Sequence, residues 1–382
     1  MSSLIVGFIY DSFTSYRSQG FSIEECMEFD TDDTIKEMIR SLETCGHNVV
    51  PVAGIKQLVA MLAEGKHESW DLAFPTAEGM YGAGREAQVP GLLEAYQIPH
   101  VFSDAATLSL SHDKGRTKMV LEHLGIPTAP FAIVPATCPD SGDDLQWIIA
   151  DVLAKSRHAK LMKFPLFIKP ACEGSSKGIY SFSKVRTMAE LAEGVRKLRS
   201  RYPDQSILIE CFLAGSEYSV SILGTGASAR VIGTVHLDWK SAKKPLKAAG
   251  DATTGGPDAD DGLYDIPSWD DPSQDNSYPV RVVSAKDNLE IQRTEDLALE
   301  AWRALGCRDT GRVDLRWGLD GLPYVLEINA IPGMRPEWST LTKTAASNGI
   351  SHEQLIGAVL NSALERYPQL KSRNQSISVV KS

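Results

Sequence analysis

The carboxylates that are the clearest candidates for a chemical role in this sequence lie on two strand-like runs, which flank an Asp-Gly dipeptide. The segment 311–330 reads GRVDLRWGLDGLPYVLEINA, and polar residues alternate with apolar ones on both sides of Asp320 and Gly321. Asp-Gly strongly favours a two-residue hairpin turn. If these two residues form the turn, the register of the hairpin places Asp314 opposite Glu327.

The same register places Arg312 opposite Asn329, so that all four side chains share one face. Directly opposed side chains have Cβ atoms about 5 Å apart, where two carboxylates repel by roughly 3 kcal/mol at an effective dielectric constant near 20. A cation between them relieves this repulsion, and carboxylate and amide oxygens without thiol or imidazole suit Mg²⁺. The hairpin therefore predicts a Mg²⁺ site. The simpler alternative is that one carboxylate faces solvent or pairs with Arg312.

A second polar cluster follows the apolar residues at the start of segment 167–178, FIKPACEGSSKG. Lys169 comes at the end of a strand-like run, and the Gly and Ser residues after it allow backbone N–H groups and hydroxyls to approach a phosphate. The segment does not match the P-loop pattern G-x-x-x-x-G-K-[ST], and no G-x-G-x-x-G follows the first strand-like run. A plain hairpin turn is the alternative interpretation.

Two further lysines, Lys114 and Lys118, are spaced so that a helix places them on one face. Such pairs are most often solvated. In combination with Lys169, the Gly/Ser loop and the carboxylate pair, they instead describe a site for a nucleoside triphosphate, because phosphoryl transfer depends on cations that neutralise phosphate charge.

These residues need a scaffold, and the first hundred residues supply strand-like runs at 4–10, 48–53 and 70–76, with a helix expected at 32–47. Strands that alternate with helices indicate a parallel sheet covered on both faces. We therefore expect an α/β N-terminal domain at 1–108.

Two further units are expected, at 109–212 and 213–375, with a tail at 376–382. A helix within 111–130, with Ser111 as its N-cap, opens the second unit. The other expected elements are strands at 166–170, 178–185, 206–213, 218–224, 227–237, 311–317 and 323–330, and helices near 188–200, at 294–306 and at 352–366. Between the strands of the third unit, residues 238–288 are rich in Gly, Pro, Ser and Asp and predict a long loop.

The composition points to an ordinary globular enzyme of small molecules. With 382 residues, 43% of them hydrophobic, and a formal net charge of -10, the chain has no basic block that would favour nucleic acid or an anionic membrane as partner. The six cysteines (Cys26, Cys45, Cys138, Cys172, Cys211, Cys307) show no metal-ligand spacing. We expect a cytoplasmic protein with reduced thiols and no membrane anchor; a homodimer is the assembly considered.

Taken together and in this order, four segments resemble the ATP-grasp superfamily, and within it the D-alanine–D-alanine ligases. They are DKGRTKMVLEHLGIPTAP (113–130), FIKPACEGSSKG (167–178), ILIECFLAGSEYSV (207–220), and GCRDTGRVDLRW (306–317) with LPYVLEINAIPGM (322–334). The resemblance covers nearly the whole chain. It implies a three-domain ATP-grasp architecture and an enzyme that joins a carboxylate to an amine.

The resemblance also implies roles for individual residues. ATP would be bound by Lys118, Lys169, Glu173, Ser175, Ser176, Glu210, Phe212, Leu213 and Glu217. Mg²⁺, or Mn²⁺ in its place, would be held by Asp314, Glu327 and Asn329. Arg312 and the Gly333 amide would stabilise the oxyanion of the tetrahedral intermediate, and Ser175 would act at the reacting groups.

Several departures from the family concern the substrate rather than ATP. The acidic motif that helps hold the first amino acid's ammonium group has no clean equivalent in 11–30, and Glu78-Gly79 stands where these ligases have His-Gly. The carboxylate-binding serine corresponds to Ser339 or Thr340. The lid loop is much longer than in the family, and Lys240, Lys243 or Lys244 would reach the γ-phosphate from it.

The sequence thus predicts a Mg²⁺- and ATP-dependent ligase that forms an amide bond through an acyl phosphate, between amino acids or similar small molecules. Glu78 is expected to hold a substrate ammonium group. The same fold also accommodates a ligase that joins a non-amino-acid carboxylate to an amine or thiol. A nucleotide-binding regulatory protein without turnover is the alternative from a different class.

Overall fold

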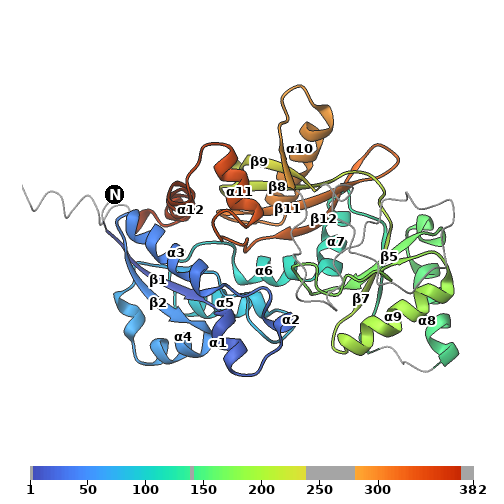
Figure 1. The fold of residues 1–382 in the computed structure, drawn as a ribbon, viewed down its shortest axis with the longest axis horizontal. Helices are drawn as coiled ribbons and strands as arrows, with labels where there is room; N and C mark the ends of the chain where they lie inside the picture. Colours follow the sequence, from blue (N-terminus) through green and yellow to red (C-terminus); the bar gives the residue numbers. More distant parts are fainter. Residues whose placement is uncertain (1–2, 138–141, 238–279, 371–382) are drawn as a thin grey trace, which may run out of the picture.

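The chain forms three units in series, each around its own sheet (Figure 1). The computed structural model describes residues 3–137, 142–237 and 280–370. Cys138, the three predicted lid lysines (Lys240, Lys243, Lys244) and the predicted tail lie outside these residues. The predicted mixed α/β fold is confirmed, whereas the domain boundaries stay a prediction.

The N-terminal sheet is parallel, as predicted, with β1 (Ile5–Tyr10) between β2 (Asn48–Ala53) and β3 (Leu72–Pro75). Alternate residues of β1 point to opposite faces. Phe8 packs with α3 (Asp32–Thr44), whereas Ile9 packs with α4 (Gly54–Ala63) and α5 (Gln88–Ala95). The remaining helical elements here are α1 (Phe13–Ser18), α2 (Ile23–Cys26), η1 (Lys66–Ser69), η2 (Arg85–Ala87) and α6 (Ala105–His112).

The helix that opens the second unit is α7 (Lys114–His123), and its N-cap is Asp113, whose side chain accepts a hydrogen bond from Arg116 N. The prediction of Ser111 as the N-cap was wrong. Ser111 lies inside the preceding helix α6, which begins after Asp104. Both residue types favour N-caps, and a break between two short helices at Asp113 was not visible in the periodicity.

The second unit holds a four-stranded antiparallel sheet in the order β4-β7-β5-β6. Its elements are β4 (Phe131–Val134), α8 (Gly142–Lys155), η3 (Ala159–Met162), β5 (Leu166–Pro170), β6 (Lys184–Val185), α9 (Met188–Arg201) and β7 (Ile207–Cys211). The strand predicted at 178–185 shrinks to β6, because the residues before it form turns.

The third unit is a five-stranded antiparallel sheet in the order β10-β9-β8-β11-β12. Its elements are β8 (Glu217–Leu223), η4 (Gly226–Ser228), β9 (Arg230–Leu237), β10 (Val280–Val283), α10 (Leu289–Ala304), β11 (Thr310–Trp317), β12 (Pro323–Asn329), α11 (Thr340–Ser347) and α12 (His352–Arg366). The loop predicted to reach residue 288 is therefore too long, since β10 pairs with β9. Helix α10 also begins earlier than predicted, at Leu289 after its N-cap Asn288.

The β11–β12 hairpin confirms the predicted pairing of Asp314 with Glu327 but not the route to it. Gly318 N donates to Leu322 O, so the turn holds three residues, and Gly321 adopts a positive φ of 73°. This turn shifts the register, and an irregularity between Asp314 and Leu315 shifts it back. The prediction of a two-residue turn was wrong, and the two offsets cancel at the carboxylate pair.

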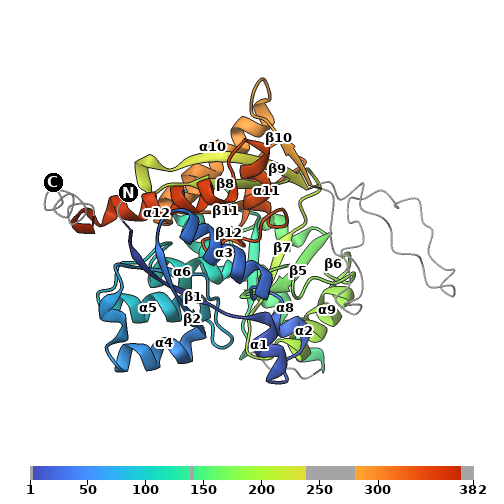
Figure 2. The ribbon, with the colours of Figure 1, turned by 60° about the vertical axis from the view of Figure 1, so that its left-hand side comes forward.

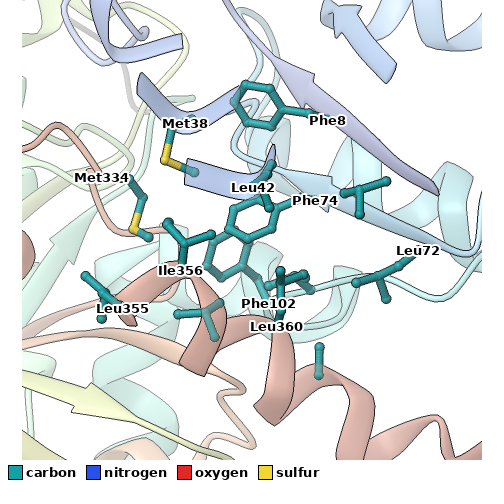
Figure 3. Close-up of a cluster of buried hydrophobic side chains, with 14 of the residues drawn as sticks. Phe8, Met38, Leu42, Leu72, Phe74, Phe102, Met334, Leu355, Ile356 and Leu360 are labelled. Atoms are coloured by element: carbon teal, nitrogen blue, oxygen red, sulfur yellow. The ribbon is translucent and has the colours of Figure 1, made fainter. Parts of the chain in front are cut away.

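The N-terminal and third units share a hydrophobic core. Figure 3 shows Phe74 and Phe102 beside Ile356 and Leu360 of α12, whereas Phe8 contacts Phe74 from the other side of the cluster; all five are almost fully buried. Apolar burial on this scale stabilises by about 2 kcal/mol per side chain. The two units therefore form one continuous block. Among the described residues, no helix combines the length and apolar character that a membrane crossing requires.

The N-terminal unit meets the second unit through polar contacts. Figure 2 shows α2 beside α9, where Tyr202 Oη donates to Glu24 Oε1 over 2.7 Å. A few residues on, Glu28 accepts a hydrogen bond from Gly174 N at 2.8 Å and pairs with Lys177 Nζ at 2.8 Å. Segment 11–30, which carries both glutamates, thus reaches across to the Gly/Ser loop.

Candidate active site

Two adjoining cavities lie where the three units meet. The first, of about 140 Å³, lies between β5 and β7 of the second unit and the third-unit strands. The second, of about 460 Å³, extends toward the N-terminal unit and α11. We call them the nucleotide cavity and the substrate cavity, after the roles that the sequence predicts for the residues that line them. Both are lined by Lys114, Ser176, Glu217, Asp314 and Glu327, which form their shared wall.

The nucleotide cavity has an apolar lining and a buried lysine pair. Phe167, Ile179, Phe212, Leu213 and Leu326 supply the apolar surface. Lys118 Nζ lies 2.5 Å from Glu210 Oε1, and Lys169 Nζ lies 2.9 Å from Glu210 Oε2. Burial alone would raise the pKa of Glu210, but the two ammonium groups outweigh it and lower the pKa. The two lysines and Glu210 together therefore carry one positive charge in excess.

Lys114, weighed at first as a solvated lysine, is buried in the shared wall. Its Nζ lies 3.2 Å from Glu327 Oε2 and also donates to Glu173 O. Burial would raise the pKa of Glu327, but Lys114, Lys169 and Arg312 lower it to about 2. Glu327 is thus ionised and already balanced by cations.

Asp314 is held from three sides. Its carboxylate accepts hydrogen bonds from Ser219 Oγ, Asn329 Nδ2 (2.9 Å) and Arg312 Nη2 (3.2 Å). The pairing with Arg312 is the alternative that the sequence left open, and it is present here. Burial, with Glu327 nearby, raises the pKa of Asp314.

The donor set fits a metal ion only when phosphate is present. Among the described residues, no three His, Cys, Asp or Glu side chains are grouped to hold an ion by themselves. Mg²⁺ commonly takes one or two carboxylates and completes its shell with phosphate oxygens and water. Asp314, Glu327 and Asn329 match that need, since all line the substrate cavity and the two carboxylates also line the nucleotide cavity.

The Gly/Ser loop bends sharply over the shared wall. Ser175 and Ser176 have φ values of 49° and 59°, and Gly178 follows at 77°. Such backbone is uncommon for residues other than glycine and persists where the surroundings enforce it. Glu28 contributes to this by accepting from Gly174 N. Glu173, at the start of the loop, pairs with Lys177 Nζ at 2.6 Å.

The third-unit end of the substrate cavity is cationic. Arg312, Gly333, Ser339 and Thr340, all predicted site residues, line it together with Arg335 and Lys343. Ser339 precedes α11, and its Oγ accepts from Arg335 N at 3.1 Å. A helix N-terminus and two cations suit a carboxylate.

The N-terminal end of the same cavity is acidic. Glu78, the predicted substrate ligand, lines it with Glu28, Asp30 and Glu86. Arg85 Nη2 lies 2.7 Å from Glu28 Oε2. Gly79 N donates to the buried Asp11, which fixes the backbone next to Glu78.

Of the predicted site residues that the structure describes, all except Lys118 line the two cavities, and Lys118 pairs with Glu210, which lines the nucleotide cavity. Sequence reasoning missed Glu28, Asp30, Arg85, Lys177 and the His112–Glu86 pair. Glu28 lies in the segment judged to lack an acidic equivalent. Lys177, in the quoted loop, was the one signal that a carboxylate partner was needed.

Comparison with known proteins shows which protein family this chain resembles. The D-ala D-ala ligase C-terminus family matches residues 120–361. D-alanine–D-alanine ligase from Xanthomonas axonopodis pv. citri is 32% identical over 328 residues, which cover 86% of this chain and 88% of that protein. The ligase from Paraburkholderia phytofirmans is 32% identical over 330 residues, with 86% and 90% covered.

The chain belongs to the D-alanine–D-alanine ligase family. Solved structures agree on the fold: D-alanine–D-alanine ligase from Bacillus anthracis, complexed with ATP, superposes with a TM-score of 0.66 at 22% identity and covers 96% of this chain and 99% of that one. The predictions of an ATP-grasp fold and of an ATP-dependent carboxylate–amine ligase are confirmed by this family membership. The individual site assignments stay predictions.

Proposed function

We propose that this D-alanine–D-alanine ligase family member activates the carboxylate of an amino acid or similar small molecule as an acyl phosphate and joins it to an amine. The observation that carries the proposal is the shared wall. Lys114, Asp314 and Glu327 face both cavities, so a γ-phosphate bound there meets a carboxylate that enters from the substrate side.

The nucleotide cavity supports the ATP half of this proposal. Its apolar surface around Phe212 and Leu213 suits adenine. Lys169, which lines the cavity, and Lys118, which shares Glu210 with it, would bind phosphate. Ser175 and Ser176 would cover the phosphates with backbone N–H groups. Glu217, which pairs with Arg316 Nη1 at 3.1 Å, would contact ribose.

Asp314, Glu327 and Asn329 would hold Mg²⁺, which neutralises the charge of the transferring phosphoryl group. The donor carboxylate attacks the γ-phosphorus and ADP leaves with the bridging oxygen. The amine then attacks the carbonyl carbon of the acyl phosphate, loses a proton, and phosphate departs. Arg312 and the Gly333 N–H would stabilise the oxyanion between these two events, where fixed donors are most effective.

The charges at the two ends of the substrate cavity would determine the orientation in which the two substrates bind. Its acidic end suits the ammonium group of the carboxylate donor, and its cationic end, with Ser339, Thr340 and Lys343, suits the carboxylate of the amine substrate. Peptide-like bond formation between two amino acids satisfies both ends.

The test is ADP formation by the purified protein with ATP, Mg²⁺ and a panel of single amino acids and amino acid pairs of both chiralities. We expect at least one pair to stimulate ADP release with a matching amide product. If no pair that stimulates ADP release gives an amide product, the ligase proposal is excluded.

A further inference from the structure

The charge of Glu28, at the acidic end of the substrate cavity, is balanced within the protein. Its carboxylate contacts Arg85 Nη2 (2.7 Å), Lys177 Nζ (2.8 Å) and Gly174 N (2.8 Å), and its side chain is 4% exposed. Burial would raise the pKa of Glu28, but Arg85 and Lys177 lower it to about 2. Glu28 therefore needs no cation from a ligand.

Glu78 lacks such a balance. Arg85 Nη1 donates to the main-chain oxygens of Glu78 (3.3 Å) and Gly79 (3.2 Å) instead of the Glu78 carboxylate. Within residues 3–137, 142–237 and 280–370, no hydrogen bond or ion pair joins this carboxylate to a cationic side chain. Burial, with Glu28 nearby, raises the pKa of Glu78 well above its ordinary value.

Asp30 is the second unbalanced carboxylate of this end. Its Oδ2 accepts a hydrogen bond from Thr76 Oγ1 at 3.0 Å, and no cationic side chain in the described ranges pairs with it. Burial raises the pKa of Asp30 to about 7. A carboxylate without a cation in a partly buried site is stabilised when a ligand supplies one.

Glu86, the remaining acidic residue at this end, has a hydrogen-bond partner in His112. His112 Nδ1 lies 2.7 Å from Glu86 Oε1, and the His112 side chain is buried. Glu78 and Asp30 are therefore the two carboxylates of this end that have no Lys, Arg or His partner among the described residues.

We propose that the carboxylate donor is a dibasic amino acid, and that Glu78 and Asp30 bind its two cationic groups. This inference rests on the ligase function proposed above. A donor with a neutral side chain brings one positive charge, its α-ammonium group, and leaves one of the two carboxylates uncompensated. A side-chain ammonium or guanidinium group adds the second positive charge, so that the donor balances both carboxylates and supplies N–H donors to each.

The first test measures the selectivity for the carboxylate donor, independently of the amine substrate. Hydroxylamine replaces the amine substrate, attacks the acyl phosphate and gives a hydroxamate, so that only donor selection is read. Lysine is compared with norleucine, and arginine with citrulline, in both chiralities, because the members of each pair are close in size and differ in charge. We expect the cationic member of a pair to have a kcat/KM at least about tenfold higher. Equal values within both pairs would overturn the proposal.

The variants Glu78→Gln and Asp30→Asn test the residues. Each should raise the KM for the cationic donor about tenfold and leave the KM for ATP unchanged. Each should also reduce the ratio of the kcat/KM for the cationic donor to that for its neutral analogue. Glu37→Gln on α3, whose side chain is 44% exposed, is the matched control and should change neither constant. An unaltered preference in both cavity variants would contradict the assignment.

A binding measurement needs no variant. Titration calorimetry of the wild-type protein, with Mg²⁺ and a non-hydrolysable ATP analogue, should show lysine bound more tightly than norleucine. If neutral amino acids support hydroxamate formation as well as dibasic ones, the ligase proposal stands and this inference fails. If no amino acid supports it, both fail.

Discussion

The nucleotide cavity and the acidic end of the substrate cavity differ in how their charged side chains are balanced. In the first, Lys118 and Lys169 share Glu210, and on its wall Lys114 pairs with Glu327. In the second, Glu78 and Asp30 have no cationic partner among the described residues.

This difference shows which part of the site is preorganised and which is completed by its ligand. Charges fixed by internal partners cost little reorganisation when a phosphate arrives. Unbalanced carboxylates instead gain their partner from the substrate, which makes them determinants of specificity. Variants at the two places should therefore differ in which measurement they change.

The largest effect is expected at the shared wall. Asp314→Asn and Glu327→Gln should each fold and lose Mg²⁺-dependent ADP formation by roughly a hundredfold or more, because each removes a charge that would hold the ion against the phosphates. Steady-state rates over a Mg²⁺ titration measure this. A near-normal rate in either variant would remove the carboxylate pair from the mechanism.

A change inside the nucleotide cavity should affect stability as well as ATP. Lys118→Met leaves the buried Glu210 with Lys169 as its remaining ion-pair partner, and breaking a buried pair costs about 3 to 5 kcal/mol. We expect a lower Tm and a weaker Kd for ATP. Lys160→Met, which breaks an exposed pair with Asp320, is the control. Equal stability of the two variants would contradict the internal pairing.

The carboxylate pair shows how far the sequence could lead. The prediction that Asp314 faces Glu327 was correct, although it assumed a two-residue turn. In the structure, a longer turn and a compensating irregularity after Asp314 produce the same pairing. Strand alternation places Asp314 and Glu327 on one face because both lie on regular runs. Local offsets between the turn and the pair were invisible, since they depend on packing of the hairpin.

The acidic end could not be predicted in the same way. Glu28 reaches Gly174 and Lys177 only through the path of segment 11–30 across two units of the fold. No periodicity encodes a contact between residues so far apart in the chain. Glu78 was found because it departs from the resembled family, and Asp30 because the structure places it on the same cavity wall.

The comparison also predicts a poor reaction with D-alanine. D-alanine fits the phosphate chemistry of the shared wall but brings a single positive charge to the acidic end. We expect D-alanyl-D-alanine synthesis at a kcat/KM at least about tenfold below that of the best substrate pair. Product analysis by mass spectrometry decides this, and efficient synthesis would show that Glu78 does not select the donor.

The smallest effect concerns the stability cost of leaving Asp30 without a cation. Burial raises its pKa to about 7 from an ordinary value of 3.8. At a pH between these two values, the folded state therefore holds a proton that the unfolded state has released. Stability from this group is therefore complete below pH 3.8 and is lost as the pH rises toward 7, with an upper limit of about 1.4 kcal/mol per pH unit.

Asp30→Asn removes this dependence. Because the side chain is partly exposed, we expect an effect smaller than this upper limit. Relative to wild type, Asp30→Asn should raise the free energy of unfolding by about 1 kcal/mol more at pH 8 than at pH 5. Urea denaturation at the two pH values measures it, and Asp33→Asn, at an exposed position in the first turn of α3, is the control. The same variant should weaken cationic donor binding, so that stability and specificity change in opposite directions. A gain of equal size at both pH values would show that Asp30 is ionised without cost, and the acidic end would then be as well balanced as the nucleotide cavity.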